Sequence, residues 1–251
     1  MNIFPSKNEK LITITIIGFL LGLSVGLLSA LEMADRKELI PSLAALFAAF
    51  FGASTAFFLE SRSRKREKRI SQLDAANQLL YVLFERLNTV KLFQIDFIEP
   101  VRDDPGRMLS LQPMANYHAP ESKMEAEKIA YIFQTSHKDL MFELHVVNEQ
   151  FQEVVNSIRH RSNLHLNVCQ PLLEQAGHRM GDAITNNDVL NAVGERNYEM
   201  LRQSTDVVIG NVDKFVERAD KLRSRLILVF SEIFSKDEVF GFELLDNSLN
   251  K

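Results

Sequence analysis

The stretch LIPSLAALFAAFFGASTAFFLESRSRKREKR, residues 39–69, decides the fold. Its first 21 residues, 39–59, carry no charge, and a helix of about 20 apolar residues spans the hydrocarbon core of a bilayer. The segment that follows, SRSRKREKR, holds six Lys or Arg in nine residues. A basic cluster directly after an apolar run is typical of a helix end on the cytoplasmic side. The stretch therefore predicts a transmembrane helix whose C-terminal end faces the cytoplasm.

A second uncharged run, residues 11–31, precedes this stretch and is also 21 residues long. A cleaved secretory signal is the alternative reading, but the apolar part of a signal peptide is only about 7–15 residues long. We therefore favour a second transmembrane helix. The connector, residues 32–38, has seven residues, and Pro41 falls where the first turn of a helix tolerates proline. The two runs then form a tight transmembrane hairpin without an external domain.

The positions of Lys and Arg predict the orientation of this hairpin. Lys7 and Lys10 precede it, six basic residues follow it, and the connector has two. Because basic residues collect on the cytoplasmic side, we expect both termini in the cytoplasm of a bacterial inner (plasma) membrane protein. We expect anionic lipid headgroups to contact the basic residues, an interpretation favoured over a nuclear-localisation or nucleic-acid patch. The predicted lipid-contact residues are Arg62, Arg64, Lys65, Arg66, Lys68 and Arg69.

Small residues recur at every fourth position of both apolar runs, which lets helix backbones approach closely in lipid. The predicted transmembrane packing residues are Gly18, Gly22, Gly26 and Ala30 in the first run and Ala44, Ala48, Gly52 and Ala56 in the second. The packing would join the two runs or two protomers. Neither run contains an ionisable residue, which argues against proton relays and transport of charged substrates.

The rest of the chain differs from this head in charge. Residues 1–69 hold ten Lys and Arg against six Asp and Glu, whereas residues 70–251 hold nineteen against twenty-seven. An acidic body disfavours nucleic-acid binding, which depends on Lys and Arg. The single cysteine, Cys169, excludes an internal disulfide and a cysteine-rich zinc module. Two domains are therefore expected: residues 1–69, a hairpin with its basic segment, and residues 70–251, a cytoplasmic body.

The apolar positions of the body alternate at spacings of three and four, as in coiled coils and helical bundles. Three segments show this seam: one that follows the basic run and ends at Pro100, one over residues 121–161, and one over residues 188–235. Between the first two lies a proline-rich loop of about twenty residues, 99–120, long for a mere connection. The fold class expected is an all-α membrane protein, with an elongated bundle of about three long helices.

The sequence contains few residue patterns that are typical of catalytic or metal-binding sites. His165 and Cys169 share a helix face near His160, but two soft ligands without a second pair do not make a metal site. Phosphate-binding loops and the motifs of common hydrolases are absent. We therefore predict no catalytic, cofactor-binding or metal-binding residue, no small-molecule substrate and no enzyme activity. The apolar tail 239–245 is expected to dock on the bundle as a short helix, with an exposed motif for a partner as the alternative.

These patterns favour an integral membrane interaction, scaffold or signalling protein, whose cytoplasmic bundle binds a protein partner or a second copy. A membrane effector is the alternative, in which the hairpins oligomerise and permeabilise the membrane. A membrane-tethered enzyme is a third reading and is disfavoured, because no residue pattern supports it.

Overall fold

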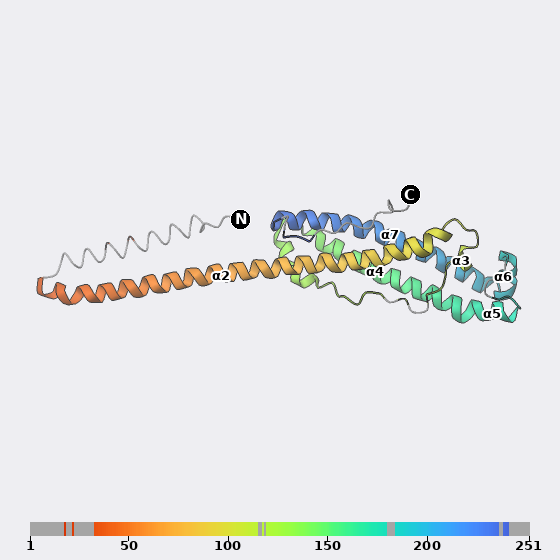
Figure 1. Ribbon diagram of the computed structural model, residues 1–251, viewed down its shortest axis with the longest axis horizontal. Helices are drawn as coiled ribbons and strands as arrows, with labels where there is room; N and C mark the ends of the chain where they lie inside the picture. The colour runs from red at the N-terminus through yellow and green to blue at the C-terminus, as the bar shows by residue number, and fades with distance from the viewer. Residues whose placement is uncertain are drawn as a thin grey trace. The chain divides into compact units, whose positions relative to one another are not determined.

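The protein is all-α in the part of the chain that the structure describes. The computed structural model describes Gly18, Gly22 and residues 33–114, 117, 119–179, 184–235 and 238–240. The elements in chain order are α2 (Met33–Phe93), η1 (Gln94–Ile98), η2 (Glu99–Val101), α3 (Arg107–Ser110), η3 (Ala126–Gln134), α4 (Asp139–Leu164), η4 (His165–Cys169), α5 (Gln170–Gln175), α6 (Asn186–Val193) and α7 (Glu195–Ile233) (Figure 1). No strand occurs among these residues, so the predicted all-helical class is confirmed.

The chain divides into two compact units, Met1–Lys68 and Arg69–Lys251. In the first unit, α2 begins at Met33, inside the connector that was predicted to be a turn, and it continues through Pro41. From Ala44 onward this helix is long and apolar enough to cross a membrane. Its apolar window, a stretch of 18 residues, contains no buried residue. Apart from Gly18 and Gly22, the first predicted span lies outside the described residues.

The second unit is built around one large hydrophobic core. Helices α2, α4 and α7 supply most of it, and α4 and α7 lie side by side (Figure 1). Leu73, Phe97 and Ile233, which the apolar period also placed on the seam, are only partly buried against this core. The other predicted seam positions are buried in it, which confirms the periodicity as a marker of the buried face. They are Ala76, Leu80, Leu83, Leu87 and Val90 in α2, Leu140, Leu144, Val147, Phe151, Val154 and Ile158 in α4, and Val208, Val212, Phe215, Ala219, Leu222, Leu226 and Val229 in α7.

A smaller core lies where α5, α6 and the start of α7 meet. Its buried members include Cys169, Leu173 and Val193, and Met108 of α3 packs into it. The chain reaches this region through η4, a π-helical turn, and Pro171 stands in the first turn of α5, where a missing N–H costs nothing.

The first helix of the body ends earlier than predicted. Its α-helical part stops at Phe93 rather than at Pro100. The chain then passes through the π-helical turn η1 and the 3₁₀ turn η2, which contains Pro100. A π turn has one more residue per hydrogen-bonded ring than an α turn, so an apolar period alone does not reveal it.

The second predicted helix begins about eighteen residues late, because α4 starts at Asp139 and not near Glu121. The 3₁₀ helix η3 occupies part of the intervening segment. Thr135 ends η3: its hydroxyl donates to the Ile132 carbonyl at 2.7 Å and accepts the His137 N–H at 3.1 Å. Such a local bond gives the backbone an alternative to continuing the helix.

The third predicted helix, 188–235, is two helices. The side chain of Thr185 accepts the Asp188 N–H, and Asp188 accepts the Thr185 N–H, so that a reciprocal capping box starts α6. Gly194 then separates α6 from α7 with φ 79° and ψ 154°, a region that is essentially restricted to glycine. Gly177, which follows the end of α5, has φ 91°.

Candidate functional site

None of the predicted transmembrane packing residues in the described part of the chain is buried. Gly18, Gly22 and Gly52 are helical and exposed, and a Cβ atom added at each would meet nothing within 4 Å. Ala44, Ala48 and Ala56 are exposed in α2, whereas Gly26 and Ala30 lie outside the described residues. Close packing of these residues therefore stays a prediction.

The predicted lipid-contact residues fall on the part of α2 that follows the apolar window. Arg62, Arg66 and Lys68 are exposed, as are Arg64 and Lys65. Arg64 pairs with Glu60 one turn earlier, at 2.6 Å. Arg69 differs from the others, because its guanidinium is half-buried and its Nη2 lies 2.8 Å from Oε2 of Glu238. One predicted lipid-contact residue is thus already bound to the C-terminal segment.

The C-terminal segment lies against α2 over residues 238–240. The side chain of Asn77 donates to the Glu238 carbonyl at 3.0 Å and accepts the Phe240 N–H at 2.9 Å. Val239 packs against the large core. Residues 239 and 240, at the start of the apolar tail, are therefore docked but not helical. Residues 241–245 lie outside the described residues, so the predicted short helix stays a prediction.

The second unit has a surface pocket of about 390 Å³ between α3 and the first turns of α7. It is lined by Arg102, Asp103, Asp104, Pro105, Arg107, Met108, Tyr198, Arg202 and Asp206. Residues 102–107 fall in the proline-rich loop 99–120 that the sequence predicts, but none of the lining residues was identified as a site. Arg102 and Arg107 lie far from Arg202 in the sequence, and the three arginines match no motif.

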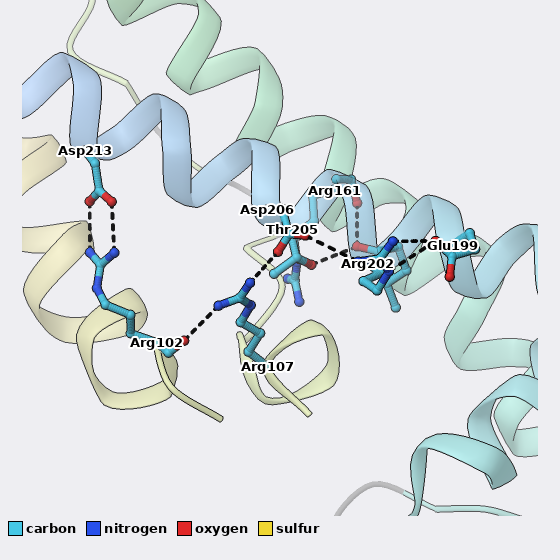
Figure 2. Close-up of polar contacts among 10 residues, drawn as sticks. Arg102, Arg107, Arg161, Glu199, Arg202, Thr205, Asp206 and Asp213 are labelled. Carbon is cyan, nitrogen blue, oxygen red and sulfur yellow. Dashed lines mark hydrogen bonds and ion pairs between the residues drawn. The ribbon is translucent and has the colours of Figure 1, made fainter. Parts of the chain in front are cut away.

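Ion pairs connect the pocket lining to α7. Figure 2 shows both terminal nitrogens of Arg102 facing the carboxylate of Asp213, with each N···O distance at 2.8 Å. Arg107 donates to the Arg102 carbonyl at 3.0 Å and to Asp206 at 2.8 Å. The hydrogen bonds from Arg102 hold the pKa of Asp213 below its usual range. These contacts attach the segment after η2 to α7.

The charges in the pocket compensate one another. Three arginines and three aspartates line it, and each arginine already binds a carboxylate: Arg102 binds Asp213, Arg107 binds Asp206, and Arg202 binds Glu199. An anion would have to displace these carboxylates. Ser, Cys, His and Lys are not among the residues that line it in the described part of the chain.

Arg161 is the largest fully buried side chain in the described part of the chain. It donates to the carbonyl of Met108 at 2.9 Å, to the carbonyl of Leu111, and to the Thr205 hydroxyl at 3.3 Å. Burial lowers the pKa of Arg161 to about 10, so the guanidinium stays charged at neutral pH. It therefore acts as a buried cation that binds backbone carbonyls, and none of its acceptors among the described residues is a carboxylate.

His165 and Cys169, the pair that shares a helix face, lie close to this cation. Burial, and then the Arg161 charge, lower the pKa of His165 to about 4. Burial raises the pKa of the Cys169 thiol, which makes it an inert buried thiol rather than a thiolate. No three His, Cys, Asp or Glu side chains gather around a metal-sized site in the described residues.

A second buried arginine, Arg86 of α2, has the same type of environment. It donates to Asn148 at 2.7 Å and to the Ser122 carbonyl at 2.8 Å, and its guanidinium carbon lies 4.6 Å from the centroid of the Phe151 ring. Burial lowers the pKa of Arg86. Sequence reasoning missed both arginines. For Arg161 a signal existed, because it continues the seam of Phe151, Val154 and Ile158 at the next spacing of three.

Comparisons of this chain with protein-family models, curated proteins and solved structures find no match. The functional argument therefore rests on the residues and their contacts.

Proposed function

We propose that this protein is a non-enzymatic interaction protein anchored in a membrane by a two-helix hairpin. In this proposal residues 70–251 form an elongated bundle of three long helices at the cytoplasmic face of a bacterial inner membrane. The bundle binds a protein partner or a second copy of the chain. The observation that carries the proposal is the contrast between an exposed apolar stretch of α2 and a second unit that buries its own core.

The exposed aromatic side chains of α2 support the membrane part of the proposal. Phe57 is 74% exposed, and Phe51, Phe58 and Leu59 are also about half exposed or more. Apolar surface in water costs about 25 cal/mol per Å², so a stretch of this kind requires a covering phase. A core helix of a water-soluble protein has a similar composition, but its apolar residues are buried.

The interaction part of the proposal follows from what the second unit does with its polar groups. Its pocket is lined by arginines that are already ion-paired. The buried groups that could do chemistry, His165 and Cys169, are held neutral by their surroundings. Because each of these groups serves the internal structure, the outer faces of the helices are the surfaces left for recognition.

Reporter fusions test the anchor. A cytoplasmic reporter fused after Lys251 should be active, and the same reporter placed within residues 32–38 should be inactive because the connector is expected outside the membrane. A periplasmic reporter should give the opposite pattern. Activity of the periplasmic reporter after Lys251 would contradict the proposed orientation.

Replacement of the anchor tests the interaction role against membrane permeabilisation. If the hairpin only anchors the body, an unrelated hairpin of the same topology should preserve partner binding, and Leu222→Asp, at a buried position of α7, should abolish it. Lys221→Asp, at the exposed neighbouring position, is the matched control and should retain binding. Dye leakage caused by residues 1–69 alone, and removed by Gly22→Leu, would favour the permeabilising alternative instead.

A further inference from the structure

The C-terminal segment and the last basic residue of the 61–69 run are joined by a set of contacts that the proposed anchor does not require. Arg69 pairs with Glu238, and Asn77 binds the backbone on both sides of Val239. Arg69 and Asn77 are eight positions apart and lie on the same side of α2, because eight residues make about two turns. We call these four residues, Arg69, Asn77, Glu238 and Phe240, the latch.

Glu238 is the centre of the latch. Its Oε2 accepts from Arg69 at 2.8 Å and from the Ser235 N–H at 3.0 Å. The same residue offers its carbonyl to Asn77. The Glu238 carboxylate and the backbone that Asn77 binds belong to the same residue. A change in the partner of the carboxylate therefore acts directly on that backbone.

The ion pair in the latch is accessible to competitors. The side chains of Arg69 and Glu238 are 39% and 41% exposed, and an ion pair of that exposure adds little to stability. A guanidinium binds a phosphate group with two parallel hydrogen bonds, which makes phosphate a strong competitor for a carboxylate. The sequence places Arg69 at the end of the basic run that follows the apolar window.

We propose that phosphate headgroups of anionic lipids compete with Glu238 for Arg69 and so release residues 238–240 from α2. This inference rests on the proposed membrane anchor. On a neutral bilayer the latch stays closed, and on an anionic bilayer Arg69 turns to the lipid. The state of the C-terminal segment then reports the lipid composition at the anchor.

Hydrogen exchange of the Phe240 amide measures the latch directly, because that N–H is bound by Asn77 only while the latch is closed. The full-length protein is reconstituted in nanodiscs of neutral phosphatidylcholine and in nanodiscs with an added anionic phospholipid. Exchange at Phe240 should be about fivefold faster in the anionic nanodiscs, the ratio that corresponds to the usual preference of one basic residue for an anionic surface. Neutral nanodiscs with added inorganic phosphate should match neutral nanodiscs alone.

Two variants separate the latch from a general effect of lipid on the protein. Glu238→Gln should give fast exchange at Phe240 in both kinds of nanodisc, because Arg69 has lost its carboxylate. Glu217→Gln, the matched control, removes an exposed carboxylate that pairs with Lys221 on α7 and should behave as the original protein does.

Four outcomes would overturn the proposal. Exchange at Phe240 that is equal in both nanodiscs, or a lipid dependence that survives in Glu238→Gln, would refute the latch while leaving the anchor in place. Acceleration by inorganic phosphate in neutral nanodiscs would refute lipid as the competitor. Failure of the protein to co-purify with nanodiscs of either composition would refute the anchor and the latch together.

Discussion

Replacement of glycine by alanine should have opposite effects on stability at two positions of the second unit. Gly194, between α6 and α7, has φ 79° and ψ 154°, whereas Gly210 lies inside α7 with open space where a Cβ atom would be. An L-residue at the Gly194 conformation costs about 1–3 kcal/mol. Alanine also restricts the unfolded chain, which returns about 0.4–1 kcal/mol. We therefore expect Gly194→Ala to lower the free energy of unfolding by about 1–2 kcal/mol.

At Gly210 the same change should increase stability. Alanine is favoured over glycine inside a helix by about 0.8–1 kcal/mol, and no neighbouring atom lies within 4 Å of the added methyl group. The two variants should differ by about 2–3 kcal/mol, measured as the shift of the urea midpoint of the full chain in detergent, followed by circular dichroism. Equal stabilisation by both substitutions would show that residues 188–235 form one continuous helix and that the break at Gly194 is wrong.

Two further predictions concern the interior of the second unit. The pKa of His165 is lowered to about 4 in the folded protein, whereas an unfolded histidine titrates near 6.5. The unfolded chain therefore takes up a proton first, and stability should fall as the pH drops from about 6.5 to 4. His165→Gln should remove about 2–3 kcal/mol of that loss, measured by urea unfolding at pH 7 and 4.5. Phe215→Ala, at a fully buried position, should lower the free energy of unfolding by about 3–5 kcal/mol. Phe142→Ala, at a side chain that is 70% exposed, should lower it by about 0.5 kcal/mol or less. A similar loss for both variants in thermal unfolding would mean that the core is placed wrongly.

The long core helices could be predicted from the sequence because their buried residues repeat at the helical period. Leu144, Phe151 and Ile158 in α4 and Phe215, Leu222 and Val229 in α7 lie one heptad apart, and all are buried. The helix ends were predicted less well. Phe93 precedes a π turn, Thr135 forms a local hydroxyl bond, and Gly194 takes a backbone conformation that a helix does not use. Each of these depends on backbone geometry that hydrophobic spacing does not encode.

The candidate site could not be predicted, because it is made by long-range pairs. Arg102 and Asp213 are 111 residues apart, and Arg107 and Asp206 are 99 apart. Charged residues on a helix are usually solvated, so Asp206 and Asp213 carry no mark in the sequence that separates them from the other acidic residues of the body. The seven-residue spacing that puts both on one face of α7 becomes informative only when the segment after η2 is placed against that face.

The proline-rich segment is the feature whose meaning changes most between sequence and structure. Its length suggested a functional loop, but mobile binding loops belong to the parts of a protein with few internal bonds. Here Arg161 binds the carbonyls of Met108 and Leu111, and Ser162 accepts the Met114 N–H at 3.0 Å. Just beyond the segment, Arg86 binds the Ser122 carbonyl. Burial of the Arg161 guanidinium costs free energy through desolvation, and that cost is offset because the group satisfies carbonyls of residues 99–114, which contain only short helices. The segment is therefore a fixed part of the second unit, and the C-terminal residues that pair with Arg69 and Asn77 are the better place to look for a movable element.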